Sequence, residues 1–148
     1  MATRFMERDR RRALQVWIAL NRAQHAIDAP LRAQVEAHGL TMKQFAVLEV
    51  LLHKGPLPVG EVGERVLLTS GSMTYVLDQL EDEGMLVRRA DPNDGRVQQV
   101  ALTDTGREFV EQVFPEHAQL LQSLMDALST PEKETLFRLL HRLRDNAA

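Results

Sequence analysis

The sequence predicts a mostly helical protein that carries one small β-hairpin. In several separate segments, apolar residues recur at the three-and-four spacing of an amphipathic helix. Two short β-prone runs, at 85–90 and 97–102, stand close together in the chain. Between them lies Asp91-Pro92-Asn93-Asp94-Gly95, a cluster of turn-forming residues typical of a hairpin tip. These observations predict helices on both sides of a hairpin, with no internal repeat or low-complexity linker.

The first helix is expected between Ala13 and Ala37, after a polar and basic segment, Met1 to Arg12, that should fray at its start. Pro30 should bend or interrupt it, because proline donates no backbone hydrogen bond. Gly39 should end it. The apolar positions that predict this helix are Leu14, Trp17 or Ile18, Leu20, Ile27, Leu31 and Val35.

A second helix, Met42 to Lys54, has a complete start signal, since Thr41 and Gln44 form a capping box. A third, weaker helix is expected from Pro58 to Leu67. Its Gly60 and Gly63 each cost about 1 kcal/mol relative to alanine. A glycine here either allows the next helix to approach closely or simply marks a poor helix, and the sequence leaves both alternatives open.

The next helix starts in a hydroxyl-rich stretch after Thr69 and should end at Gly84. Its apolar face consists of Met73, Val76, Leu77 and Leu80. The hairpin follows, so the predicted order is helix, turn, helix, hairpin.

Two further helices are expected after the hairpin. Thr103 caps the first, which should run to Ser129 with a kink at Pro115. Ser129-Thr130-Pro131-Glu132 starts the second. That last helix carries a leucine stripe at positions 136, 139, 140 and 143. One small domain could not cover this stripe and the apolar face of the first helix, so a homodimer is expected.

Composition narrows the class of protein. With 44% hydrophobic and 26% charged residues in 148, the chain is typical of a globular protein of one domain. The net charge of −3 argues against indiscriminate coating of nucleic acid, but a specific DNA-binding protein needs only a local positive surface. Without cysteine there are no disulfides and no thiolate chemistry. Neither a signal peptide nor a span of about 20 apolar residues is visible, so we expect a cytoplasmic protein with no membrane partner.

The middle of the chain resembles the MarR-type (multiple antibiotic resistance regulator) winged helix-turn-helix transcription factors. The resemblance rests on Leu40-Thr41, Gln44-Phe45, Val47-Leu48, Gly55-Pro56, Thr74, Leu80-Glu81, Gly84, Asp91-Pro92, Asp94, Arg96, Leu102-Thr103 and Gly106. It implies an N-terminal dimerisation helix at 1–39, a winged helix-turn-helix DNA-binding domain at 40–103, and C-terminal dimerisation helices at 104–148. It also implies double-stranded DNA as the partner, in the form of a pseudo-palindromic operator.

The expected function is therefore that of a homodimeric repressor, released from DNA by a small-molecule effector, with aromatic compounds as the first class to consider. Hydroxyls and an amide on the helix after Thr69 should face the DNA, and hairpin residues should contribute the rest of the surface. In order, the expected DNA-binding residues are Ser70, Ser72, Thr74, Tyr75, Gln79, Arg88, Arg89, Asp94 and Arg96. Arg96 matches the family's wing arginine, and Asp94 should steady it.

Three alternatives accompany this interpretation. Trp17, Met42 and Met73 either line an effector pocket or fill the core. A metal-responsive regulator of the same fold would use His38, Glu116 and His117, although the five histidines show no HxxxH spacing, and we predict neither a metal site nor a cofactor. A helical protein-interaction scaffold is the third alternative. No motif of nucleophilic, phosphate-binding or zinc-hydrolase chemistry is present, so no enzyme activity is expected.

Overall fold

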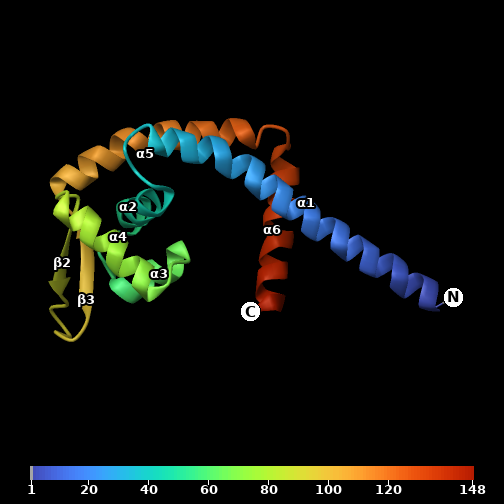
Figure 1. Cartoon of the computed structure of the whole chain (residues 1–148), viewed down its shortest axis with the longest axis horizontal. Helices are drawn as coiled ribbons and strands as arrows, with labels where there is room; N and C mark the ends of the chain where they lie inside the picture. Colours follow the sequence, from blue (N-terminus) through green and yellow to red (C-terminus); the bar gives the residue numbers. More distant parts are fainter. Residues whose placement is uncertain (1) are drawn as a thin grey trace.

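The computed structural model describes residues 2–148 and shows a lobe of short elements beside three longer helices (Figure 1). The elements in chain order are α1 (Ala2–Glu36), α2 (Met42–Lys54), β1 (Leu57–Pro58), α3 (Val59–Val66), α4 (Ser70–Asp82), β2 (Leu86–Ala90), β3 (Gln98–Leu102), α5 (Asp104–Leu124) and α6 (Thr130–Ala147). The lobe holds α2, α3, α4 and the sheet, while α1 and α5 run side by side above it. The chain is therefore a helical protein with a small sheet, as predicted.

The first helix is longer than predicted. It begins at Ala2, so the expected start at Ala13 is wrong. Arginine, glutamate and methionine, which dominate that segment, are good helix formers. Pro30 lies inside α1 without ending it. Met1 lies outside the described residues.

The sheet has three strands, in the order β1-β3-β2, where the sequence predicted two. The predicted hairpin forms β2 and β3, with Leu86 opposite Leu102. The third strand is β1, whose Leu57 and Pro58 pair with Val100 and Gln99. Pro58 therefore precedes α3 and does not belong to it. Two residues are too few to show strand periodicity, which explains why the sequence did not reveal β1.

Local start and stop signals set most of the remaining boundaries. The capping boxes at Thr41 and Ser129 are both present. Gly84 follows α4 with a φ of 73°, a left-handed conformation that favours glycine. Two predicted ends were wrong: α5 stops at Leu124 instead of Ser129, and Leu67 leaves α3 in a left-handed conformation with 90% of its surface exposed.

The hydrophobic core lies mostly within the lobe, and Val35 of α1 and Val110 and Val113 of α5 also belong to it. The apolar face predicted for α4 is entirely buried, with Met73, Val76, Leu77 and Leu80 at most 3% exposed. Gly63 of α3 lies against this face, since a Cβ atom there would lie 3.2 Å from Met73 Cγ, whereas one at Gly60 would meet nothing within 4 Å. Of the two glycines, Gly63 is thus the one that allows α3 and α4 to approach closely.

A second close approach joins the lobe to α5. The Thr103 hydroxyl donates to the Gly84 carbonyl (2.5 Å) and accepts from the Gly106 backbone N–H (3.0 Å). A Cβ atom at Gly106 would lie 1.8 Å from the Met85 carbonyl oxygen. Glycine at 106 therefore lets α5 start directly against the end of the recognition unit formed by α4, β2 and β3.

Candidate nucleic-acid interface

Helix α4 presents a polar face opposite its buried one. Ser70, Thr74 and Tyr75 are exposed, and Ser72 and Gln79 are half-buried. Thr69 caps the helix by accepting from the Ser72 backbone N–H. The polar face predicted from the sequence is therefore present and open to solvent.

Two hydroxyls on this face are already hydrogen-bonded within α4. The Thr74 hydroxyl donates to the Ser70 carbonyl (3.1 Å), and the Ser72 hydroxyl oxygen lies 3.2 Å from the Thr69 hydroxyl. Tyr75, with 66% of its surface exposed, extends furthest as the large side chain on this face. It accepts from the Gln79 amide nitrogen (3.1 Å).

The β2–β3 hairpin is called the wing. Asp91 organises its tip. One of its carboxylate oxygens accepts from the backbone N–H groups of Asn93 (2.7 Å) and Asp94 (3.2 Å). The other accepts from the Gln99 amide across the hairpin (2.7 Å). In the sequence Asp91 stood out only as a turn former, although an aspartate that precedes proline in a turn commonly makes such bonds.

Arg96 projects from the wing with its side chain 92% exposed. Asp94 accepts from the Arg96 Nε (3.1 Å) and from its backbone N–H (3.1 Å). The Arg96 guanidinium, followed by this backbone bond, holds the pKa of Asp94 below its usual value. The carboxylate therefore stays charged and fixes the base of the arginine, while the guanidinium remains accessible.

Arg88 lies in a different environment from Arg89 and Arg96. Its guanidinium donates to Asp78 (2.6 Å) and Glu81 (2.6 Å), both on α4, and its side chain is only 25% exposed. The hydrogen bond to Asp78 raises the pKa of Arg88 above its already high value. Arg88 thus ties the wing to α4, while Arg89 is exposed. No sequence pattern revealed this pairing, because its partners lie seven and ten residues away on another element.

Gln44 is a residue of this region whose sequence context indicated only a helix cap. It is 5% exposed, and its amide nitrogen donates to the Gln79 amide oxygen on α4 (3.3 Å). A buried glutamine on α2 thereby contacts a side chain predicted to face DNA.

The residues considered for metal binding do meet in one polar cluster between α1 and α5. His38 Nε2 lies 2.8 Å from Glu116, and His117 Nδ1 lies 3.1 Å from Gln34, which itself reaches Glu116. His38 also holds the pKa of Glu116 below its usual value. Among residues 2–148, however, no three histidine, cysteine or acidic side chains are arranged to hold a metal ion.

The three residues predicted to line an effector pocket lie in different surroundings. Met73 belongs to the core at 2% exposure, Met42 packs against the edge of that core, and Trp17 is 63% exposed on α1. A cavity between α1, α5 and α6 is lined by other residues. The structure also contains, in its described part, no helix long and apolar enough to cross a membrane.

Comparison with known proteins places these features in a family. Residues 40–97 match the sequence model of the MarR family. The HTH-type transcriptional regulator MhqR of Bacillus subtilis is 38% identical over 136 residues, which cover 92% of this chain and 94% of that protein.

Solved structures agree with this match. A cysteine-to-serine mutant of E. coli MarR in complex with operator DNA superposes with a TM-score of 0.78 at 26% identity, covering 89% of this chain and 95% of that one. Bordetella bronchiseptica BpsR, from a study of its regulation by 6-hydroxynicotinic acid, gives a TM-score of 0.78 at 28% identity, covering 88% and 93%.

Proposed function

Because this chain belongs to the MarR family of DNA-binding transcriptional regulators, we propose that it acts as a homodimeric repressor that a small aromatic effector releases from its operator. The observation that carries the proposal is the joining of α4 to the wing by Arg88. This ion-pair cluster makes a helix and a hairpin into one unit. Such a unit can place a helix in the major groove and a wing in the adjacent minor groove.

On DNA, the polar face of α4 lies in the major groove and the wing reaches the adjacent minor groove. Ser70, Ser72, Thr74, Tyr75 and Gln79 supply donors and acceptors to base edges and phosphates. Arg96 enters the minor groove, where a narrow groove concentrates negative potential, and Asp94 aims it. Arg89 contacts phosphate. Arg88 acts indirectly, as a positioning residue between α4 and the wing.

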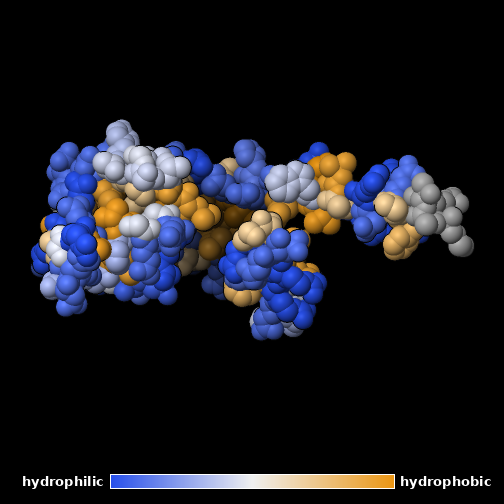
Figure 2. Space-filling view, turned by 90° about the horizontal axis from the view of Figure 1, so that it is seen from below, coloured by the Kyte–Doolittle hydropathy of each residue, from blue (hydrophilic) through white to orange (hydrophobic). Residues whose placement is uncertain are grey.

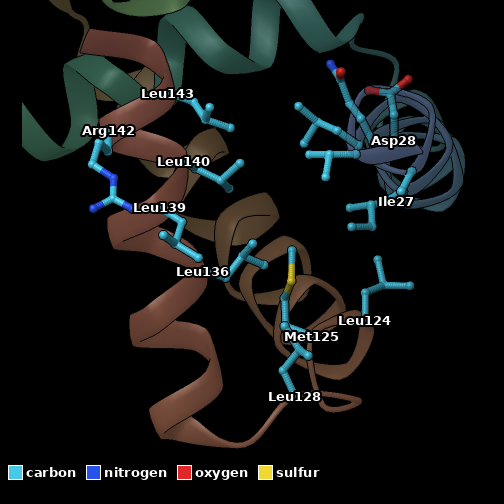
Figure 3. Close-up of a pocket in the computed structure, with 15 residues that line it drawn as sticks. Ile27, Asp28, Leu124, Met125, Leu128, Leu136, Leu139, Leu140, Arg142 and Leu143 are labelled. Carbon is cyan, nitrogen blue, oxygen red and sulfur yellow. The ribbon is translucent and has the colours of Figure 1, made fainter. Parts of the chain in front are cut away.

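The proposed dimer rests on the surface of the terminal helices. None of the residues of α6, all of which the structure describes, is buried. A cavity of about 940 Å³ opens between α6, α1 and the end of α5, and Leu124, Leu136 and Leu140 are among its apolar lining (Figure 3). Figure 2 shows apolar surface along α1 and in the hollow beside it. A second copy of the chain would cover these surfaces and set two α4 helices against a two-fold symmetric operator.

The effector part of the proposal rests on similarity to BpsR, whose DNA binding is regulated by 6-hydroxynicotinic acid. In the dimer, each protomer contributes one lobe. An effector that binds only an arrangement of these two lobes that does not fit DNA would shift the dimer away from the arrangement that does.

The test is fluorescence anisotropy with the DNA upstream of the protein's own gene, titrated with salt and then with a panel of hydroxylated aromatic acids that includes 6-hydroxynicotinic acid. We expect a saturable complex whose logarithmic affinity falls linearly with the logarithm of salt concentration, and at least one acid that dissociates it. If the upstream DNA is bound no more tightly than unrelated DNA, the proposed repressor function is contradicted. Selective binding that no acid in the panel weakens would contradict the aromatic effector.

A further inference from the structure

Four residues form a continuous hydrogen-bonded chain from the start of α2 to the exposed face of α4. The Thr41 backbone N–H donates to the Gln44 amide oxygen (3.0 Å). The Gln44 amide nitrogen donates to the Gln79 amide oxygen (3.3 Å). Finally, the Gln79 amide nitrogen donates to the Tyr75 hydroxyl oxygen (3.1 Å).

The direction of every bond in this chain follows from its first member. A backbone N–H can only donate, so the Gln44 atom that faces Thr41 must be its oxygen. The Gln44 amide nitrogen then faces Gln79 and requires an acceptor there. If the Gln79 amide were turned over, two NH₂ groups would face each other across 3.3 Å. The Gln79 nitrogen must therefore point to Tyr75 and donate to it.

Tyr75 consequently has its proton free. A phenol hydroxyl can donate one hydrogen bond, and here its oxygen is already accepting from Gln79. The side chain is 66% exposed, so the proton can turn outward to a ligand on the face of α4. Gln44, in contrast, is 5% exposed and never reaches that surface itself.

We infer that Gln44 is a specificity-determining positioning residue, which fixes Tyr75 as a hydrogen-bond donor toward a base acceptor in the major groove. This inference rests on the proposed placement of α4 in that groove. The acceptors available there are N7 of either purine, O6 of guanine and O4 of thymine. The amino groups of adenine and cytosine are donors, which the proton of a tyrosine held in this way cannot satisfy.

Two substitutions reverse the direction of the hydrogen bond between position 79 and Tyr75. Gln44→Glu keeps a threonine-x-x-glutamate capping box at the start of α2. Its carboxylate can only accept, so Gln79 must turn its nitrogen toward position 44 and its oxygen toward Tyr75, which then uses its proton internally. Gln79→Glu achieves the same reversal at a half-buried position, because the new carboxylate accepts from both Gln44 and Tyr75.

The experiment removes single acceptor atoms from DNA. The full-length wild-type protein first selects its preferred sequence from random duplexes. Each purine of that sequence is then replaced by its 7-deaza analogue, each guanine by 2-aminopurine, which lacks O6, and each thymine by an analogue that lacks O4. Affinity is measured for the wild type and for the variants Tyr75→Phe, Gln44→Glu and Gln79→Glu. Gln119→Glu, an exposed change of the same chemistry on α5, serves as the control.

For the wild type we expect at least one analogue position to weaken binding about tenfold, the loss typical of one base contact. That loss should disappear in Tyr75→Phe and in both glutamate variants, and it should persist in Gln119→Glu. Thermal melting identifies any variant that fails to fold, and the other glutamate variant then decides.

Three results would overturn the inference. The first is an analogue loss that persists in a folded Gln44→Glu or Gln79→Glu protein. The second is a wild type and a Tyr75→Phe variant that respond equally to every analogue. The third is a Tyr75→Phe loss that is uniform over all sequences, which would place the hydroxyl on phosphate. A wild type that selects no sequence at all would instead contradict the proposed function.

Discussion

The lobe and the terminal helices bury their apolar residues to very different extents. In the lobe, Phe45 of α2 is 1% exposed and packs within a continuous core. On α6, Phe137 is 65% exposed, and on α1 Trp17 is 63% exposed. The lobe is therefore packed around a core to which α1 and α5 also contribute Val35, Val110 and Val113, whereas α6 and the first half of α1 carry apolar side chains that one chain leaves in water. The lobe with the adjoining parts of α1 and α5 accounts for the core, and we expect the exposed apolar side chains of α6 and of the first half of α1 to serve assembly.

The most severe way to test this division is to delete Pro131–Ala148. We expect the lobe to stay folded while the protein becomes monomeric or aggregates, because the apolar lining of the cavity loses one wall. Operator affinity should fall by about 100-fold or more, since a monomer loses the avidity of two linked half-sites. Sedimentation velocity and anisotropy measure the two effects. Deletion of only Asp145–Ala148, which spares the leucine stripe, is the matched control. A dimeric truncation that still binds operator would refute the assignment of α6 to the interface.

A pair of phenylalanine substitutions sharpens the comparison. Phe45→Ala should lower the free energy of unfolding by about 3 to 5 kcal/mol per chain, because it leaves a cavity in a packed core. Phe137→Ala should raise the dissociation constant of the dimer and leave the stability of the lobe unchanged. Urea denaturation and sedimentation equilibrium distinguish the two outcomes. Equal loss of lobe stability in both variants would show that the two regions share one core.

Within the lobe, Arg96 should contribute to operator binding alone, whereas Arg88 should contribute to both operator binding and stability. Arg96→Ala is expected to weaken operator binding by about 1 to 3 kcal/mol per half-site without changing the melting temperature, because the side chain is 92% exposed. Arg96→Lys should restore part of the loss, since an ammonium is more strongly hydrated than a guanidinium. Anisotropy at physiological salt is the measurement. Wild-type affinity in Arg96→Ala would exclude the wing tip from DNA binding.

Arg88→Ala should weaken operator binding and also lower the stability of the lobe. The stability loss should be about 1 kcal/mol, because Asp78 and Glu81 are partly solvated and water screens the ion pair. Urea denaturation measures it. Arg65→Ala breaks a more exposed pair with Glu61 on α3 and is the control, for which we expect a smaller change. An Arg88→Ala protein with the stability and the operator affinity of the wild type would show that the arginine does not hold the wing.

The smallest expected effect is a dependence of stability on pH at the border between the two regions. Burial lowers the pKa of His117 below its ordinary 6.5, and Glu49 opposes this only in part. Between the folded and unfolded pKa values, the unfolded chain binds the proton more readily, so stability is lost as pH falls below about 6.5. Melting temperatures across this range should show a flatter profile for His117→Gln than for the wild type. His25→Gln, exposed on α1, should keep the wild-type profile.

Helix boundaries were predictable wherever a local signal sets them. Thr41 with Gln44, Thr103 and Ser129 each cap a helix at the expected position, because a cap joins residues only three positions apart. The buried face of α4 was predictable for the same reason, since helical periodicity is a short-range pattern. The homologous relatives confirm the family that the residues of 40–106 resemble. The DNA contacts and the dimer remain proposals.

The sequence by itself thus determined the order of helices and hairpin, the apolar faces, and the polar residues available to touch DNA. Only the tertiary structure decided how those residues work together. In it, Arg88 pairs with α4, Gly63 and not Gly60 lies at the close contact between helices, and Gly106 lies against Met85. It also brought Gln44 to Gln79, 35 residues further along the chain. Each of these is a distance between elements that pack only after the core has formed, and no pattern of neighbouring residues encodes such a distance.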